Sequence, residues 1–414
     1  MRNHKSKMSS LDSPCSDINL VTSSSMLGLP EEVFLHVISY LDTRTKLSAA
    51  QVCKAWQGAL DDWNLWEGVT ARLSIDMDMN MIVPVLEKRR INRVHISKNQ
   101  LQEVEEEVLE EGVWAEKEWE EEEDFTELCN LTRMMSNSLC SLDLSNLHVL
   151  NSKLLEALTP TMNKLTELIL SDQPLYKIST YQTLTTSCSK LERLVCCNSL
   201  MPNSDVADMG ITMPNLLELD LSVGSPGPLF SYRFCSAEFV SHVMPKLTKL
   251  NLSTCRITHD GLVSLSQLEF LQELNMQCCS ELPDDCICVL SEGKCSQQLT
   301  VLNINHCSMM NSEVVVTSMA DHPLPLTEFS ISSYEWCSIT DNGLEALLSS
   351  GKHLETRRLY DQTSISNAGL FLMTQTCSRL KTLVLSKQNL CINEAGIDMI
   401  NSMASKPQVI YHDE

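Results

Sequence analysis

The most regular stretch of the chain, residues 247–262, alternates apolar and polar side chains and reads LTKLNLSTCRITHDGL. Leu250 and Leu252 are separated by one polar residue, a spacing typical of a short, half-buried strand. Cys255 follows, and a polar turn then leads to Gly261, where an apolar segment begins. The pattern predicts a strand, a turn and a helix in close succession.

The same pattern recurs along the chain, with 24 to 31 residues between the starts of successive units. One such unit cannot bury its apolar face alone, so copies must stack on both sides of it. Ile91, Val94 and Ile96 form a degenerate unit within residues 90–101. The first leucines of the ten regular units are Leu139, Leu165, Leu191, Leu216, Leu247, Leu271, Leu299, Leu326, Leu354 and Leu380.

These units resemble leucine-rich repeats in pattern and in length. Three units carry cysteine at the inward position, Cys255, Cys279 and Cys307, and so resemble the cysteine-containing class of these repeats. The resemblance implies an α/β solenoid, a leucine-rich-repeat horseshoe of about eleven repeats. Arg357 stands where an apolar residue is expected, which predicts an irregular unit there. The final residues, VIYHDE, are interpreted as a terminal strand or cap.

Residues 27–68 have a helical pattern instead. A polar turn separates two apolar-patterned helices, and the segment ends in Leu65-Trp66. About 40 residues with this much apolar surface fold only marginally alone, so a partner or the next domain should cover part of them. The apolar residues of the first helix fall on one face: Val33, Phe34, Val37, Ile38 and Leu41.

This segment, LGLPEEVFLHVISYLDTRTKLSAAQVCKAWQGALDDWNLWEGV, resembles an F-box. The resemblance implies a helical hook that binds the Skp adaptor protein and, through it, a cullin scaffold. For Val52 and Trp56, a place in the core of the hook is an equal alternative. The residues that the resemblance places at or near the adaptor are Leu29, Pro30, Ile38, Leu41, Val52, Cys53 and Trp56.

The remaining segments differ in composition. Residues 1–26 lack periodicity and predict a disordered tail, and residues 69–102 predict a helical connector with the degenerate first repeat. Residues 103–124 hold twelve Glu and one Asp against one Lys, and they form an acidic insertion. We interpret this insertion as a solvated loop or, alternatively, as an arm that binds a basic partner. The solenoid is expected over residues 125–414.

The net charge of −23 argues against a nucleic-acid partner and against an anionic membrane surface. The sequence contains no apolar run long enough to predict a membrane span, and its first residues lack the apolar core of a secretory signal. We therefore expect a cytoplasmic or nuclear protein whose cysteines are reduced and bind no metal. No cysteine pair has the spacing of a zinc site, so no cofactor is predicted.

The repeat also predicts where a protein substrate binds. Side chains that flank the second and third leucine of each unit point away from the core, and stacking aligns them in two columns on the sheet. Acidic residues gather in the first six units and predict contact with a basic or polar substrate segment, although an ordinary solvated face is an equal alternative. The candidate substrate-binding residues are Asp143, Glu167, Glu218, Asp220 and Glu273, with Arg358 and Tyr360 at the far end.

Three functional classes fit these features. The F-box resemblance favours the substrate-recognition subunit of an SCF-type ubiquitin ligase, which joins a Skp adaptor, a cullin and an F-box protein. The alternatives are an F-box adaptor that acts without a ligase and a protein-binding scaffold resembling ribonuclease inhibitor. An enzyme is disfavoured because no stretch outside the F-box and the repeats is long enough for a catalytic domain, and no catalytic residue is assigned.

Overall fold

The computed structural model describes residues 31–97, 125–145, 147, 158, 161–171, 187–197, 213–222, 240–241, 244–307, 310–332, 339–350, 354–360, 364–376, 379, 381–386, 392–403 and 407–412. Its internal contacts divide the chain into two compact units. Unit 1 is Met1–Glu67 and unit 2 is Gly68–Glu414. The tail at 1–26 and the acidic insertion at 103–124 lie outside the described residues.

Unit 1 is a small helical unit. Its buried side chains include Phe34 and Ile38 from the first helix and Leu60 and Trp66 near the end of the unit. The indole N–H of Trp66 donates a hydrogen bond of 2.7 Å to the carbonyl oxygen of Leu60, which ties the end of the unit to its third helix. The elements are α1 (Glu31–Ser39), α2 (Thr43–Ala49), α3 (Lys54–Ala59) and the 3-10 helix η1 (Trp63–Trp66).

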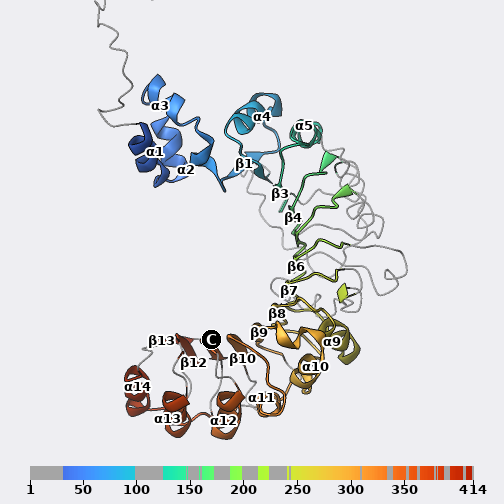
Figure 1. Ribbon diagram of the computed structural model, residues 1–414, viewed down its shortest axis with the longest axis vertical. Coiled ribbons are helices and arrows are strands. Elements are labelled where there is room, and N and C mark those ends of the chain that lie inside the picture. Colours follow the sequence, from blue (N-terminus) through green and yellow to red (C-terminus); the bar gives the residue numbers. More distant parts are fainter. Residues whose placement is uncertain are drawn as a thin grey trace, which may run out of the picture. The chain divides into compact units, whose positions relative to one another are not determined.

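Unit 2 is an α/β solenoid. Thirteen strands of the described chain form one sheet in sequence order, and every neighbouring pair is parallel (Figure 1). The strands are β1 (Thr70–Ser74), β2 (Arg93–Ser97), β3 (Ser141–Asp143), β4 (Glu167–Ile169), β5 (Arg193–Val195), β6 (Glu218–Asp220), β7 (Lys249–Asn251), β8 (Glu273–Asn275), β9 (Val301–Ile304), β10 (Glu328–Ser332), β11 (Thr356–Tyr360), β12 (Thr382–Ser386) and β13 (Gln408–His412).

The helices of unit 2 lie on one side of this sheet (Figure 1). We call the opposite side of the sheet the open face. Within the described residues no helix has the length and apolar character needed to cross a membrane. The helices are α4 (Met79–Lys88), α5 (Thr126–Met134), α9 (His259–Ser266), α10 (Cys286–Glu292), η4 (Lys294–Gln297), α11 (Ser312–Ser318), α12 (Asp341–Ser350), α13 (Asn367–Thr376) and α14 (Glu394–Asn401).

The strands extend beyond the predicted repeats at both ends. The degenerate unit forms β2, and the final residues form β13, the terminal strand that was one of the two interpretations of VIYHDE. β1 was not predicted, because its sequence TARLS shows only one large apolar residue, Leu73. At the expected irregular unit β11 is still formed, and Arg357 is in register with Phe329 and Leu383.

The core of unit 2 follows from the repeat. The central leucines of successive strands, such as Leu142, Leu168 and Leu194, are fully buried. Each such burial stabilises the fold by about 1.5–3 kcal/mol. The predicted inward cysteines are also buried, and they link repeats: the thiol of Cys279 donates to the carbonyl oxygen of Leu252 at 3.1 Å, and that of Cys307 donates to Met276 at 3.2 Å.

Helix starts in the second half of the solenoid are capped by the preceding repeat. The carboxylate of Glu313 accepts hydrogen bonds from the backbone N–H and the hydroxyl of Thr340, at 2.8 and 2.7 Å. One repeat later, Asp341 accepts from the N–H and hydroxyl of Ser366, at 2.9 and 2.5 Å. These bonds satisfy donors that a helix start leaves without a partner.

This arrangement explains the glycines near the starts of α12 and α13. A Cβ added at Gly343 would overlap the side chain of Glu313, and one at Gly369 would overlap that of Asp341. The near copies CSITDNGL and TSISNAGL therefore keep glycine to leave room for the capping carboxylate of the previous repeat. Glycine is otherwise unfavourable in a helix.

Candidate functional site

The seven predicted adaptor-binding residues occupy different environments. Leu29 and Pro30 lie outside the described residues. Ile38 is buried, with 3% of its surface exposed, and Leu41 is half-buried. Val52 is 64% exposed, in the turn before α3, and Cys53 is the exposed residue that precedes that helix.

Trp56, on α3, is half-buried, and its ring meets that of Phe34 edge to face at a centroid distance of 5.0 Å. Such aromatic pairs stabilise by about 0.5–1.5 kcal/mol beyond the area they bury. Ile38 and Trp56 therefore support the fold of unit 1, whereas Val52 is presented to solvent. The role of the seven residues in adaptor binding stays a prediction.

Unit 1 also exposes several apolar residues, among them two from the apolar face predicted for the first helix. Phe34 and Ile38 of α1 point into the core, whereas Val33 and Val37 are exposed. The packing of α1 against η1 divides the apolar face that the pattern treated as one. We call the following exposed residues the unit 1 apolar surface: Val33, Val37, Tyr40, Leu47 and Val52.

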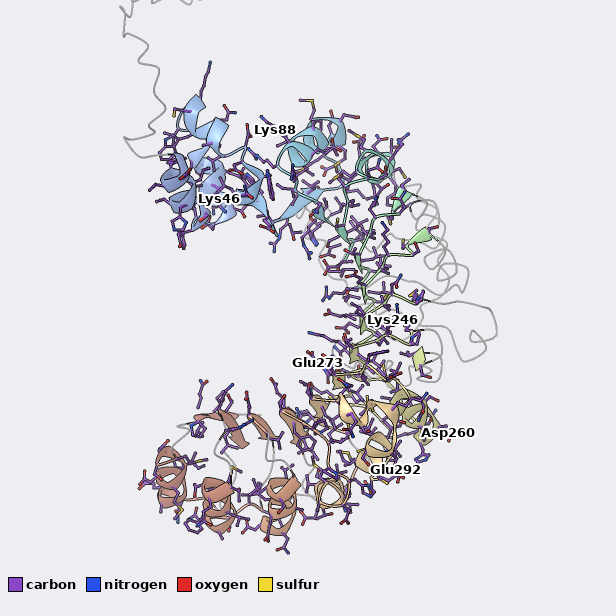
Figure 2. The ribbon with its side chains drawn as sticks, viewed as in Figure 1. Lys46, Lys88, Lys246, Asp260, Glu273 and Glu292 are labelled. Carbon is purple, nitrogen blue, oxygen red and sulfur yellow. The ribbon has the colours of Figure 1, made fainter. Side chains whose placement is uncertain are left out.

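A buried lysine stabilises the same unit. Lys46 of α2, labelled in Figure 2, is buried and donates a hydrogen bond of 2.8 Å from its ammonium group to the carbonyl oxygen of Leu65. A buried cation is tolerated only when its hydrogen bonds are satisfied. The contact joins α2 to η1 across 19 residues of sequence and fixes the helix that carries Leu47.

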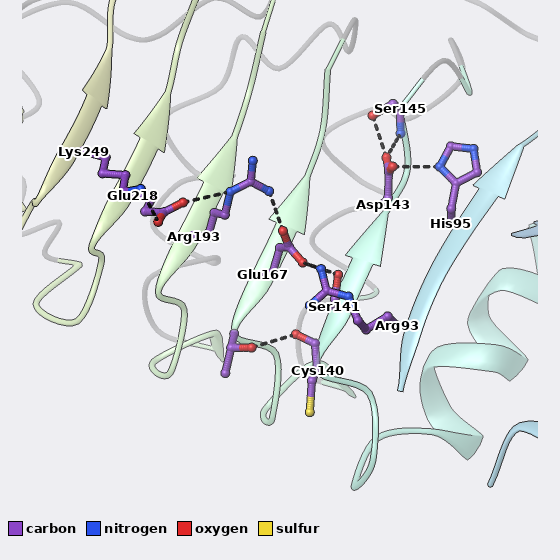
Figure 3. A network of polar contacts seen from close by, with 11 residues as sticks. Arg93, His95, Cys140, Ser141, Asp143, Ser145, Glu167, Arg193, Glu218 and Lys249 are labelled. Carbon is purple, nitrogen blue, oxygen red and sulfur yellow. Dashed lines mark hydrogen bonds and ion pairs between the residues drawn. The ribbon is translucent and has the colours of Figure 1, made fainter. Parts of the chain in front are cut away.

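The open face of unit 2 carries a row of alternating charges, shown in part in Figure 3. The strand register confirms the two predicted columns. It places Glu167 beside Arg193 in the first column and Asp143 beside Ile169 in the second. Ion pairs connect Glu167 to Arg193 and continue along the row. We call the row the charge ladder; its members are Arg93, Glu167, Arg193, Glu218, Lys249 and Glu273.

Glu167 has the most enclosed position in the charge ladder. It is buried, and it pairs with both Arg93 and Arg193 while the hydroxyl of Ser141 donates to it at 2.6 Å. Burial opposes ionisation of this carboxylate, but the hydrogen bonds from Ser141 and Arg193 and the two positive charges outweigh it. The pKa of Glu167 is therefore below its usual value of 4.5.

The remaining ladder pairs are more open to solvent. Arg193 reaches Glu218 at 3.1 Å, and Lys249 lies 3.8 Å from Glu218 and 3.0 Å from Glu273. The hydrogen bond from Lys249 to Glu273 is the main reason that the pKa of Lys249 is raised. Three cations and three carboxylates alternate, so the ladder has no net charge. The predicted acidic character of this column is offset by Arg93, Arg193 and Lys249.

Polar residues of the second column stabilise the turns that follow their strands. Asp143 accepts a hydrogen bond of 3.0 Å from the N–H of Ser145, and Asp220 accepts one of 2.9 Å from the N–H of Ser222. Both carboxylates thereby form the turn that follows the strand. The same bond, to the N–H two residues on, is made by Asn251, Asn275 and Asn303.

Asp143 has a further partner, the imidazole of His95, whose Nδ1 lies 2.8 Å from the carboxylate (Figure 3). Burial raises the pKa of Asp143, but the hydrogen bonds from Ser145 and His95 dominate and lower it from its usual value of 3.8. Asp220 contacts neutral donors, and the side-chain amide of Asn251 donates to it at 3.1 Å. Asp220 is thus the candidate carboxylate best placed to accept an added cation.

Three of the predicted substrate-binding residues line one hollow. The hollow has a volume of about 340 Å³ and extends from β5 to β10 on the sheet. Its polar lining comes from the charge ladder and from the second column: Arg193, Glu218, Lys249, Glu273, Asp220, Asn251, Asn275, Asn303 and Ser330. Asp143 and Glu167 precede this stretch, on β3 and β4.

The far-end pair, Arg358 and Tyr360, lies on β11, where Arg358 continues the second column beside Ser330. Their side chains are outside the described part of the chain. The structure therefore brings Glu218, Asp220 and Glu273 together and leaves the far-end pair as a sequence prediction. The residues missed by sequence reasoning are the cationic partners, although their alternation with the carboxylates is visible along the first column.

Comparison with known families bears on unit 1. Residues 26–72 match the F-box-like family, and this match spans α1, α2, α3, η1 and the start of β1. This region is an F-box-like domain. The unit 1 apolar surface belongs to this domain.

Two solved structures are similar to this chain. One is an internalin from Listeria monocytogenes, with 17% identity over 69% of this chain and 83% of that chain and a TM-score of 0.39. The other is the complex of Rad7 and Elc1 in yeast, with 17% identity over 68% of this chain and 72% of that chain and a TM-score of 0.41.

Most of the described cysteines beyond the F-box-like domain are buried packing residues. Burial raises the pKa of Cys188 and Cys307 to about 12 and that of Cys295 to about 11. Thiols with these pKa values stay protonated near neutral pH, and a protonated thiol is a poor nucleophile and a poor metal ligand. Their surroundings suit them to the core of the solenoid.

Proposed function

We propose that this protein is the substrate-recognition subunit of an SCF-type ubiquitin ligase. The F-box-like domain binds the Skp adaptor, the adaptor connects it to a cullin, and the open face of unit 2 binds a protein substrate. The observation that carries the proposal is the F-box-like domain at residues 26–72, in the same chain as a solenoid in which thirteen strands are described. A ligase of this kind acts in the cytoplasm or the nucleus, which is where we place the protein.

The unit 1 apolar surface supports adaptor binding by this domain. Val37 and Tyr40 are 53% and 78% exposed, and both are on or beside α1. Exposed apolar side chains on a small unit favour protein contact, because covering them removes apolar area from water. Leu29 and Pro30 precede this helix and match the F-box pattern, so we assign them to the same interface.

The hollow on the open face supports substrate binding. It combines fixed charges and amide side chains with aliphatic groups such as Val195 and Val301, a lining that suits a peptide segment with polar side chains. Asp220 is held by neutral donors and can accept a basic side chain of the substrate. The ladder carboxylates Glu218 and Glu273 contribute less, because each already pairs with a cation.

The experiment that tests the proposal compares the full chain with the Leu29→Ala, Pro30→Ala double variant. Each is purified from cells in which cullin ligases or the proteasome are inhibited. The intact chain should bring down the Skp adaptor and a cullin, and the double variant should lose both. Proteins that are ubiquitinated only with the intact chain, and that accumulate on the double variant, are the substrates.

Two results would contradict parts of the proposal. Undiminished recovery of the adaptor with the double variant would remove the F-box-like domain from the interface. Recovery of the adaptor without any cullin, even with the intact chain, would favour an F-box adaptor that acts outside a ligase. Circular dichroism of the double variant checks that the solenoid stays folded.

A further inference from the structure

Three side chains with metal-binding atoms converge on the helix side of unit 2. Cys288 and Glu292 belong to α10, and His322 follows α11 in the next repeat. One ligand atom from each of the three residues lies within 4.8 Å of the other two. In Figure 2 Glu292 lies among the helices, whereas Glu273 is on the open face. The cluster is therefore separate from the surfaces assigned above.

The spacing within α10 accounts for two of the three groups. Residues four apart lie on the same face of a helix, so Cys288 and Glu292 are neighbours. The thiol of Cys288 donates to the Glu292 carboxylate at 3.5 Å. Stacking of the repeats supplies the third group, since α11 packs against α10.

The hydrogen bonds of Ser291 orient the imidazole of His322. The hydroxyl of Ser291 donates its proton to the carbonyl oxygen of Cys288 at 2.7 Å. A hydroxyl has one proton, so at its 3.2 Å contact with Nδ1 of His322 it acts as acceptor. From this contact we infer the tautomer that is protonated at Nδ1, which leaves the lone pair of Nε2 to a metal ion. Such an outer partner on the second ring nitrogen is usual for histidine ligands of metals.

We propose that Cys288, Glu292 and His322 form a zinc-binding site that joins two neighbouring repeats. Thiolate, imidazole and carboxylate are the three ligand types that Zn²⁺ takes in proteins. Cys288 and His322 are half-buried and Glu292 is exposed, so an ion can enter from solvent. Three protein ligands leave the fourth tetrahedral position to a water molecule. On binding, the proton of the Cys288 thiol passes to solvent as the sulfur–zinc bond forms.

The proposal departs from one sequence expectation, that the cysteines bind no metal. His322 is 34 residues from Cys288 (322 − 288), outside any short motif. The two are neighbours only because one repeat separates them. The expectation is unchanged for Cys188, Cys295 and Cys307, whose buried thiols are held protonated.

The test uses the full chain, stripped of metal with a chelator and then titrated with Co²⁺ and with Zn²⁺. Co²⁺ bound to a thiolate gives a sulfur-to-metal charge-transfer band, which reports the Cys288 contact directly. We expect one Co²⁺ per chain, displaced by Zn²⁺, and one zinc ion in native mass spectrometry. The band should be absent in Cys288→Ser, and binding should be lost in His322→Gln. Ser291→Ala should weaken binding by about tenfold to a hundredfold.

Two matched variants serve as controls. Cys129→Ser removes a half-buried cysteine on α5, and His259→Gln removes an exposed histidine at the start of α9. Both should bind Co²⁺ as the intact chain does. Binding that survives in Cys288→Ser and in His322→Gln, or an intact chain that binds no ion, would overturn the proposal.

Thermal unfolding gives a second readout, which does not require the Cys288 and His322 variants to fold as well as the intact chain. Zinc should raise the melting temperature of the intact chain, because an ion that binds only the folded state stabilises it. In Glu292→Gln, a change at an exposed position, this rise should shrink. An equal rise in the intact chain and in Glu292→Gln would exclude Glu292 as a ligand.

Discussion

The F-box-like domain and the open face of the solenoid both expose side chains to solvent. They differ in whether those side chains already have partners within the chain. On the F-box-like domain, Val37 and Val52 are uncovered aliphatic groups that only a partner can remove from water. On the open face, Glu167 and its neighbours already have their ionic partners within the same sheet. The first surface leaves apolar groups in water, whereas the charges of the ladder on the second are paired within the sheet.

This difference predicts two styles of binding. An apolar surface gives affinity to any partner that covers it with a matching shape, which suits one constant adaptor. A surface of paired charges gives little affinity per contact, because a new partner must replace pairs that already exist. Selectivity then comes from the fixed order of charges along Arg193, Glu218 and Lys249, which suits recognition of particular proteins.

The largest effect is expected from charges placed on the unit 1 apolar surface. Val37→Glu with Val52→Glu should weaken adaptor binding at least about a hundredfold, because burying an unpaired carboxylate costs several kcal/mol. Calorimetric titration with the purified adaptor measures the change. Val263→Glu is the matched control, at an exposed valine of α9 that is 40% accessible. Equal weakening by the control would mean that the effect is not local.

Reversal of the acidic residues in the hollow should have the next effect. Each pair contributes under about 1 kcal/mol, so single changes should do little. Glu218→Lys, Asp220→Lys and Glu273→Lys together should reduce substrate capture about tenfold, more so at low salt, where charges are less screened. Adaptor binding should not change.

A second triple variant controls for net charge in that experiment. Asp260, Asp321 and Glu345 are exposed residues on the helices or next to them, and changing them to Lys alters the net charge by the same amount. This variant should capture substrates normally. If the reversal in the hollow keeps every partner of the intact chain, the substrate site lies on the loops or the helix side.

The capping contacts between repeats can be broken by one methyl group. Gly369→Ala places a Cβ against the carboxylate of Asp341 and the side chain of Leu344, so the fold should lose about 1–3 kcal/mol. Denaturant unfolding measures the loss. Gly58→Ala is the control: a Cβ at this glycine of α3 meets nothing within 4 Å, so alanine should be neutral or slightly stabilising there.

The smallest effect concerns the pH dependence of the charge ladder. The pKa of Glu167 is lower in the folded than in the unfolded chain, so its ion pairs stabilise the fold above its usual pKa of 4.5. That contribution is lost as the pH falls through the lowered value. Glu167→Gln should therefore be less stable than the intact chain at pH 7, and the gap should narrow in acid. An equal difference in stability at pH 7 and in acid would contradict a stabilising role for the Glu167 ion pairs.

The repeat pattern was sufficient to predict the solenoid and the neighbours within each column. Leucine positions fix the strands, and a parallel sheet in sequence order fixes which residues lie side by side, such as Glu218 and Lys249. β1 was missed because Thr70–Ser74 lacks the leucine spacing.

The chemistry of the candidate site was harder to predict than its position. Acidic side chains at Glu167 and Asp143 indicate a negative surface only when their partners are ignored. Arg93 pairs with Glu167 across β3, and the hydroxyl of Ser145 donates a hydrogen bond to Asp143. Both contacts depend on side-chain direction, which periodicity does not give. The exposure of Val33 and Val37 likewise depends on which side of α1 meets η1.

The capping contacts give the solenoid a direction. Asp341 satisfies the start of the helix that follows it in the chain, and Glu313 does the same one repeat earlier. Removing a late repeat returns a carboxylate to water, at little loss to the repeats before it. Removing an early repeat leaves the next helix start with unsatisfied N–H groups. Loss of one repeat should therefore destabilise the repeats that follow it more than the repeats that precede it. A protease that trims the end of the chain would leave the remaining repeats folded.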